Sequence, residues 1–194
     1  MTSKASVSSI SSGPRVTAVV VSLLLLIVAS AAPTAWQDQP KRVVPVVAPA
    51  ALEPLVPAAI EGWTKVRSTS NRVSDGCVYA FADTVYANGD AKLRVTVADT
   101  GFDADALATV ATIVMSFPAG HTEKIPPDTV ISRITYQNNP AATMWNNAKG
   151  EAEFTVVVGD RFVAKVEGTR VDGLDTLRGV LDKIDLKKLA EIGK

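Results

Sequence analysis

Hydrophobic residues are most concentrated near the amino terminus, where residues 16–32 form an uncharged run of 17 residues. As a helix such a run spans roughly 26 Å, close to the thickness of a bilayer core of about 30 Å. The triplet Ala29-Ser30-Ala31 has the small-x-small form of a signal-peptidase site. We therefore predict that residues 1–32 contain a hydrophobic helix, which is either a cleaved signal peptide or a retained N-terminal membrane anchor.

Both outcomes carry the later residues across a membrane. Lys4 and Arg15 before the run are matched by Lys41 and Arg42 after it, so the charge asymmetry that orients an anchor does not choose between them. We expect an extracytoplasmic protein, in the periplasm or at the cell surface, that is inner-membrane anchored or secreted. The membrane is a partner if the segment stays uncleaved.

Prolines mark the next segment, because residues 33–59 hold six of the eleven in the chain. Proline fixes φ, removes a backbone donor and biases the preceding residue away from helix. We interpret residues 33–59 as an extended spacer rich in Pro, Ala and Val. The globular domain is then expected at residues 60–194.

Alternation of apolar and polar residues dominates this third part of the chain. In residues 92–97, for example, Leu93, Val95 and Val97 alternate with polar neighbours, which is typical of a strand with one packed face. Asn88-Gly89 is a strong hairpin signal. The pattern predicts strands at 62–67, 78–86, 92–99, 129–136, 142–146, 151–158 and 161–167.

Two stretches have helical spacing instead. Residues 103–117 place an apolar stripe on one helix that Asp103 or Thr100 can cap, and a second helix capped by Asp172 carries Leu174, Leu177, Leu181 and Ile184 inward, followed by an amphipathic turn at 186–192. Strands joined by tight turns are antiparallel. The prediction is an α+β fold, an antiparallel sheet of about six to seven strands packed with two helices.

A hairpin around Gly159-Asp160 leads into the last helix within the run VVVGDRFVAKVEGTRVDGLDTLRGVLDKIDLKKLAEI. This ending and the order of elements over about residues 62–192 resemble small exported bacterial domains of the PsbP/Mog1-like group. The group has no compact set of catalytic residues, so the resemblance implies no active site. It implies a binding or assembly accessory.

Composition narrows the function further. The chain has 20 basic and 20 acidic residues, and this balance argues against a nucleic-acid partner, which normally requires a positive excess. One cysteine and one histidine provide neither an intramolecular disulfide nor the ligand set of a structural zinc site. We predict no cofactor and no metal.

Few residues offer catalytic chemistry. Cys77 is a candidate thiol, but a reactive thiolate needs a histidine or cation nearby, and the single histidine, His121, belongs to a separate loop. Asp99, Asp103 and Asp105 could attract a hard cation, although acids at a helix start are favoured by the helix dipole. The chain contains no GxSxG, phosphate-binding loop, dinucleotide fingerprint or HExxH motif. We assign no catalytic residue.

Aromatic residues near strand ends are the best remaining signal. Trp63, Tyr136 and Trp145, together with Arg133, could form a ligand or partner surface if they meet in one concavity, or they could be core side chains. We expect a non-catalytic binding or assembly-accessory domain of the cell envelope, with an envelope protein or small ligand as partner. The alternatives are an envelope hydrolase or thiol-dependent enzyme, and a purely structural envelope protein.

Overall fold

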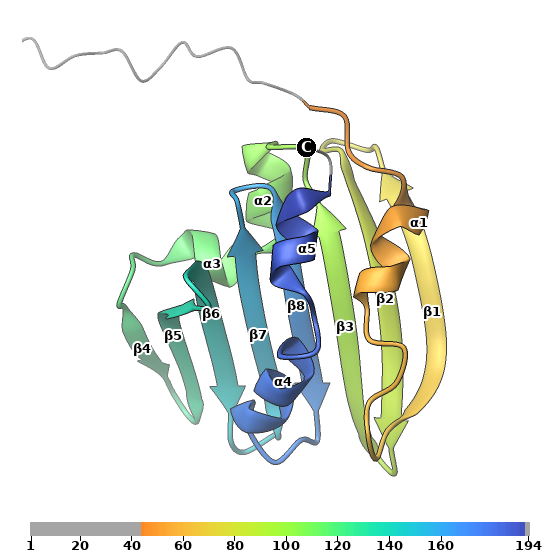
Figure 1. Ribbon diagram of the computed structural model, residues 1–194. Coiled ribbons are helices and arrows are strands. Elements are labelled where there is room, and N and C mark those ends of the chain that lie inside the picture. Colours follow the sequence, from red (N-terminus) through yellow and green to blue (C-terminus); the bar gives the residue numbers. More distant parts are fainter. Residues whose placement is uncertain (1–43, 193–194) are drawn as a thin grey trace, which may run out of the picture. The chain divides into compact units, whose positions relative to one another are not determined.

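One antiparallel sheet of eight strands organises the protein, as shown by a computed structural model that describes residues 44–192 (Figure 1). The strands lie in the order β1-β2-β3-β8-β7-β6-β5-β4. This confirms the α+β class and the antiparallel sheet. The hydrophobic helix predicted in residues 1–32 lies outside the described residues, and none of the helices within residues 44–192 is long and apolar enough to cross a membrane.

Seven of the eight strands correspond to predicted ones, although β1 runs six residues beyond the predicted 62–67 and β6 begins three residues before the predicted 142–146. The strands are β1 (Thr64–Val73), β2 (Tyr79–Asn88), β3 (Ala91–Asp99), β4 (Thr122–Ile125), β5 (Thr129–Tyr136), β6 (Asn139–Asn146), β7 (Glu151–Val158) and β8 (Phe162–Thr169). The extra strand, β4, stands where the sequence indicates a loop. All four of its residues are exposed, so no alternation of buried and exposed positions marks it.

Short helices cover both faces of the sheet. They are α1 (Pro49–Leu52), the 3-10 turn η1 (Glu53–Leu55), α2 (Ala104–Val110), α3 (Thr112–Ser116), α4 (Leu174–Leu181) and α5 (Leu186–Glu191). We call the face under α1, α4 and α5 the front face, and the face under α2 and α3 the back face (Figure 1).

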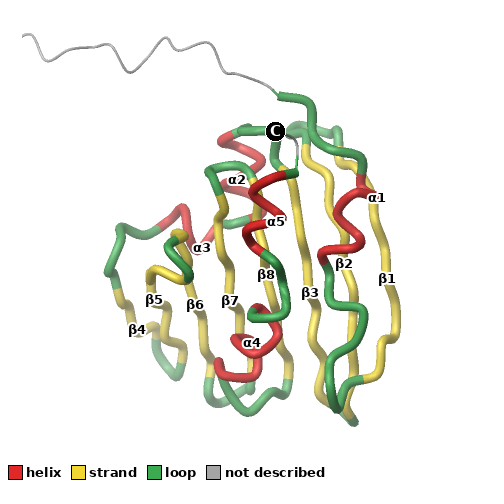
Figure 2. The backbone as a smooth tube through the Cα atoms, in the orientation of Figure 1, coloured by secondary structure: helices red, strands yellow, loops and turns green. Residues whose placement is uncertain are grey.

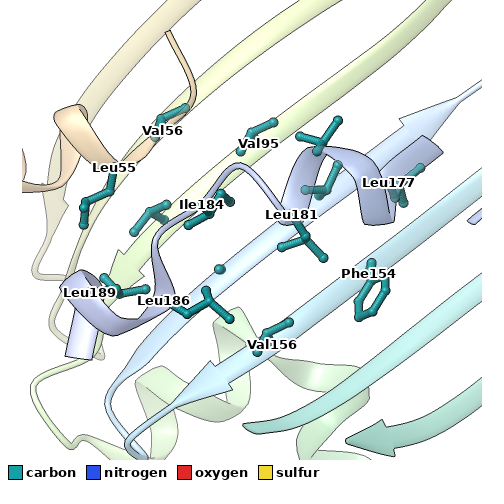
Figure 3. Close-up of a cluster of buried hydrophobic side chains, with 14 of the residues drawn as sticks. Leu55, Val56, Val95, Phe154, Val156, Leu177, Leu181, Ile184, Leu186 and Leu189 are labelled. Atoms are coloured by element: carbon teal, nitrogen blue, oxygen red, sulfur yellow. The ribbon is translucent and has the colours of Figure 1, made fainter. Parts of the chain in front are cut away.

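The main core fills the front face. Val95 and Val156 from the sheet meet Leu177 and Leu181 of α4 and Leu189 of α5, and all five side chains are completely buried (Figure 3). Each such burial contributes roughly 1.5–3 kcal/mol relative to an exposed side chain. The inward stripe predicted for the last helix is confirmed at Leu177, Leu181 and Ile184.

The back-face core is smaller. Ala98, Val157 and Val163 pack against Leu107 of α2 and Val114 of α3. A helix of seven residues, such as α2, is about 10 Å long, whereas strands of eight to ten residues extend roughly 27–33 Å. The two helices lie toward one end of the strands and leave part of the back face without a helical cover (Figure 2).

The helix predicted over residues 103–117 is interrupted. Ala111 has φ −116° and ψ 42°, outside the helical region, and separates α2 from α3. The flanking residues Val110, Thr112, Ile113 and Val114 are β-branched, and such side chains crowd the preceding turn of a helix.

Two local predictions need correction, and one is confirmed. Asp103 caps α2 by accepting hydrogen bonds from the backbone of Asp105 and Ala106. Asp172 does not cap α4, because Gly173 occupies the N-cap position and Asp172 lies one residue too early. The hairpin turn after β2 is shifted by one residue, since Asn88 pairs with Ala91 and the turn residues are Gly89 and Asp90.

Residues 44–59 differ most from the prediction, because the sequence pattern assigns them to the extended spacer. Leu52 is completely buried, Leu55 and Val56 are nearly so, and all three belong to the front-face core. Proline density suggests an extended chain, but a proline at the first position of a helix is favourable, and Pro49 begins α1. The second half of the predicted spacer is therefore part of the packed structure.

A buried ion pair holds this segment to the sheet. Arg161 donates from Nε to Asp99 Oδ1 at 2.7 Å and from Nη2 to Oδ2 at 2.8 Å. Asp99 Oδ2 also accepts the backbone N–H of Val47, and Arg161 Nη2 donates to the Pro45 carbonyl at 3.3 Å. The pair thus joins the end of β3, the β7–β8 hairpin and the first described residues.

The same junction requires a close backbone approach. Val44 donates its N–H to the Gly101 carbonyl, and a Cβ on Gly101 would lie 2.5 Å from the Val44 oxygen. Gly101 also has φ +59°, which favours glycine. Phe102 and Phe162 place their rings 5.4 Å and 4.8 Å from the Arg161 guanidinium carbon, within the range of cation–π attraction.

Asp99→Asn is expected to lower the free energy of unfolding by about 3–5 kcal/mol, because it removes the charge of a completely buried carboxylate that accepts two hydrogen bonds from Arg161. Urea unfolding measures the change. Asp90→Asn is the matched control, since the Asp90–Arg170 pair is exposed and its loss should cost less than about 1 kcal/mol. Equal, small effects of the two substitutions would contradict this role.

Candidate binding pocket on the back face

Polar residues cross the uncovered part of the back face in register. Asp83 of β2 lies opposite Thr96 of β3, Thr96 opposite Lys165 of β8, and Lys165 opposite Thr155 of β7. Residues directly opposite each other on neighbouring strands share a face and interact. We call Asp83, Thr96, Lys165 and Thr155 the polar row.

A second row lies two residues further along the same strands. Glu167 of β8 pairs with Arg94 of β3 on one side and with Glu153 of β7 on the other. We call Arg94, Glu167 and Glu153 the charged row. The middle of the uncovered half of the back face therefore carries polar and charged side chains, with Val85 and Met144 at the two ends of the charged row, whereas the half under α2 and α3 is apolar.

Asp83 connects the two rows. Its side chain is only 7% exposed, and its two oxygens accept hydrogen bonds from Arg94 Nε and Thr96 Oγ1, each at 3.1 Å. The Arg94 side chain is 51% exposed. Within the described part of the chain, the two terminal nitrogens of Arg94 have no hydrogen-bond partner, so Asp83 fixes the guanidinium while its outer edge faces solvent.

Glu153 and Glu167 place like charges opposite each other. Lys165 Nζ lies 3.4 Å from Glu167 Oε1, and Thr155 donates a hydrogen bond to Glu153 Oε1 at 2.7 Å. Burial raises the pKa of Glu153 above its usual value, and the charge of Glu167 acts in the same direction, while Thr155 and Lys165 oppose the shift. Burial is the largest of these effects, so the charged form of Glu153 is disfavoured in the folded protein.

A pocket of about 250 Å³ lies between these rows and α2. One end is apolar and is lined by Tyr79, Phe81, Ala98 and Val110. The other end is polar and includes Asp83, Arg94, Lys165 and Glu167. We call this hollow the back-face pocket.

A second hollow, of about 300 Å³, continues the polar end. It shares Arg94 and Glu167 with the back-face pocket and extends to Lys92 and Thr169. The hollowed surface is therefore longer than the pocket itself. Arg94 stands where the two hollows meet.

The arrangement is suited to holding an amphipathic group. Aromatic and aliphatic side chains offer a surface for apolar atoms, and a few charged groups of fixed orientation provide specificity, as in most ligand sites. Among residues 44–192, no group of three or more His, Cys, Asp and Glu side chains is placed to hold a metal ion.

Tyr136, one of the residues predicted for a ligand surface, belongs instead to the front-face core. Its ring meets Phe154 edge to face at 5.0 Å, and its hydroxyl donates a hydrogen bond to Asp182. Burial and the Asp182 carboxylate raise the pKa of Tyr136 to about 12. Its side chain is 5% exposed, which leaves little surface for a partner.

The other three predicted residues do not join Tyr136. Trp63 precedes β1, and Trp145 pairs with Val130 at the end of the β5–β6 ladder remote from Tyr136; both pack against the front-face core. Arg133 lies opposite Ala142, which belongs to the back-face core, and donates to the Ala141 carbonyl at 3.1 Å. The four residues are thus separated across both faces of the sheet.

Cys77 and His121 also lie apart from the back-face pocket. Cys77 is half-buried in the loop before β2, where its N–H donates to the Asp75 carbonyl. The His121 ring stacks on Phe117 at 5.0 Å, and its Nε2 is 3.5 Å from Glu123 Oε2. Neither residue lines the pocket.

The pocket residues were missed because their grouping depends on strand pairing. Alternation places Arg94 and Thr96 on the polar side of β3, and that much is readable from the sequence. It does not show that β3 pairs with β8, which lies about 70 residues later and brings Lys165 and Glu167 beside them. Asp83, the one charged residue in the mostly apolar stretch Tyr79–Tyr86, is the signal that could have been noticed.

Comparison of the chain with protein-family models, curated proteins and solved structures gives no match. The geometry of the pocket is therefore the basis for the proposals below.

Glu153→Gln is expected to raise the free energy of unfolding at pH 7. A raised pKa means that the folded state binds this proton more tightly than the unfolded state, a contribution that is fully present below the ordinary pKa of 4.5 and lost as the pH rises through the raised value. The gain should shrink as the pH falls toward 4. Urea unfolding at both pH values measures it.

Glu151→Gln is the control for this measurement, because Glu151 lies on the same face of β7 but its side chain is 45% exposed. It should show little gain at either pH. A loss of stability in Glu153→Gln at pH 7 would contradict the buried, unfavourable carboxylate.

Proposed function

We propose that the protein is an exported, non-catalytic binding domain of the cell envelope that recognises its ligand through the back-face pocket. The observation that carries this proposal is the pocket itself, where a short α2 leaves Phe81 and Val110 beside the half-exposed Arg94. The resemblance of the carboxy-terminal elements to PsbP/Mog1-like domains supports a binding or assembly role.

The pairing of the pocket's charged groups favours binding over catalysis. Asp83 is hydrogen-bonded to Arg94 and Thr96, and Lys165 pairs with Glu167. A general base or nucleophile needs to be directed at a reacting atom. These side chains are directed at one another, which is the arrangement of a preorganised recognition surface.

Export is the part of the proposal that the sequence supports. The uncharged run at residues 16–32 is long enough to insert in a membrane, and it serves equally as a signal peptide or as an anchor. Whichever it is, the pocket would face the periplasm or the cell surface, where its ligand must be found.

Export can be measured with the single cysteine of the chain. Cys77 is half-buried in a loop, so a membrane-impermeant maleimide is expected to label the protein without lysis, either on intact spheroplasts if it is anchored or in the fluid released as they form if it is cleaved. Cys77→Ser is the control and should remain unlabelled. Labelling of Cys77 only after lysis would overturn export.

Ligand recognition is tested by closing the pocket. Thr109 is exposed on α2 and lines the pocket, so Thr109→Trp should fill its mouth without disturbing the core. We expect full-length wild-type protein, incubated with a detergent extract of cell envelopes, to retain a compound or protein that Thr109→Trp does not retain, as measured by mass spectrometry.

Thr112→Trp provides the matched control. Thr112 is also exposed, and like Thr109 it donates its hydroxyl hydrogen to the carbonyl four residues earlier, but it does not line the pocket. It should retain the same molecule as the wild type. Identical recovery by all three proteins would remove the back-face pocket as the site.

A further inference from the structure

We infer that the back-face pocket binds a small amphipathic carboxylate, whose anionic group pairs with the terminal nitrogens of Arg94 and whose apolar part packs against Phe81 and Val110. This inference rests on the proposed function and names the chemical class of its ligand.

Arg94 is the group of the pocket that is available to an anion. Asp83 accepts its Nε, so the guanidinium is held in place before any ligand arrives, and its 51% exposed side chain presents the two terminal nitrogens outward. A planar guanidinium with two parallel N–H donors matches a carboxylate in a bidentate pair. Preorganisation of this kind reduces the ordering cost of binding.

The acids of the pocket are already engaged. Both oxygens of Asp83 accept hydrogen bonds, from Arg94 and Thr96, and Glu167 lies 3.4 Å from the ammonium of Lys165. Asp83 is also nearly buried, whereas Arg94 is half-exposed. A ligand entering from solvent therefore meets Arg94 before the buried Asp83, and the more exposed acid, Glu167 at 37%, already has Lys165 as its counter-charge, which favours a negative ligand over an amine.

The opposite end of the pocket accounts for the apolar part of the ligand. Tyr79 and Phe81 have ring centroids 6.1 Å apart, and Phe81 and Val110 pack at the border of the back-face core. With Ala98 they form a wall that offers no charge. The volume, about 250 Å³, is just below the range of roughly 300–1,000 Å³ for drug-sized sites, so the ligand should be small.

Asp83 acts in this site as a positioning residue. Although Asp83 lines the pocket, its side chain is only 7% exposed and both its oxygens are engaged, one by Arg94 Nε at 3.1 Å and the other by Thr96, so it acts on the ligand through Arg94. Asp83→Asn keeps the shape and weakens this hold. It should reduce affinity for a carboxylate while leaving affinity for a neutral analogue unchanged, which a purely structural role would not do.

The test compares three probes of one shape. They are 3-phenylpropanoate, the neutral 3-phenylpropanamide and the cationic 3-phenylpropylamine, titrated by ligand-observed NMR into the full-length protein in lipid nanodiscs. The signal that remains with Thr109→Trp, whose pocket is closed, measures partition of the probe into lipid, and it is subtracted from the signal of the wild type. We expect the carboxylate to bind about tenfold more tightly than the amide, as hydrogen bonds to a charged group predict.

Arg94→Gln should abolish this tenfold preference. Arg67→Gln is the matched control, because Arg67 is exposed on the same face and lies opposite Val85, the residue that also pairs with Arg94, but it does not line the pocket. It should keep the preference. If Arg94→Gln does not fold, Arg94→Lys, which keeps the charge without the planar fork, should bind the carboxylate several-fold more weakly than the wild type.

The outcomes separate this inference from the proposed function. Binding of the amide or the amine as tight as that of the carboxylate, and blocked by Thr109→Trp, would overturn the ligand class and leave the pocket as a binding site. If none of the three probes binds the wild type more than it binds Thr109→Trp, the proposed ligand class is also overturned. Recovery of a molecule from envelope extract by the wild type would still support the proposed function. An undiminished preference in Arg94→Gln would exclude Arg94 as the anchor.

Discussion

The Asp99–Arg161 pair is the interaction on which the rest of the structure depends. Removing two charges from water is costly, and only complete pairing of their donors and acceptors offsets that cost. Here the pairing draws on three separate parts of the chain, because Val47 and Pro45 supply the backbone groups that complete it. The buried pair therefore specifies where the first described residues must lie, and their position in turn allows Leu52 and Leu55 to cover the front face.

Unequal covering of the two faces follows from the lengths of the helices. Three helical segments and a 3-10 turn seal the front face with a large leucine and valine core, whereas α2 and α3 seal only one end of the back face. The polar and charged rows occupy the middle of the remainder, where the strands meet solvent. The well-packed front face thus supports the sheet whose back face carries the candidate site.

Much of this fold was predictable because it is local. Seven strands, the hairpins between them and the inward stripe of α4 follow from alternation and spacing within single segments. The correct pairing of β3 with β8 is not local, and the back-face pocket depends on it.

The prediction for residues 44–59 was wrong for a different reason. Their proline content predicts an extended chain, whereas the burial of Leu52 depends on a sheet that is formed by later residues. Trp63, Tyr136 and Trp145 have the residue types of a binding surface, but their residue type does not reveal which face of the sheet they occupy.

The entry point of the chain into the sheet has a mechanical consequence. Val44 is hydrogen-bonded to Gly101, two residues past the end of the interior strand β3, and Val47 to Asp99 at the end of that strand. A force applied from the amino-terminal side would reach these two contacts first and would pull on the interior of the sheet rather than on its edges. Strand β3 has an antiparallel partner on each side over residues 92–99, so the pull would be distributed over two hydrogen-bonded ladders. Tension would in this way act first on β3 and its neighbours β2 and β8, and not on the edge strands β1 and β4.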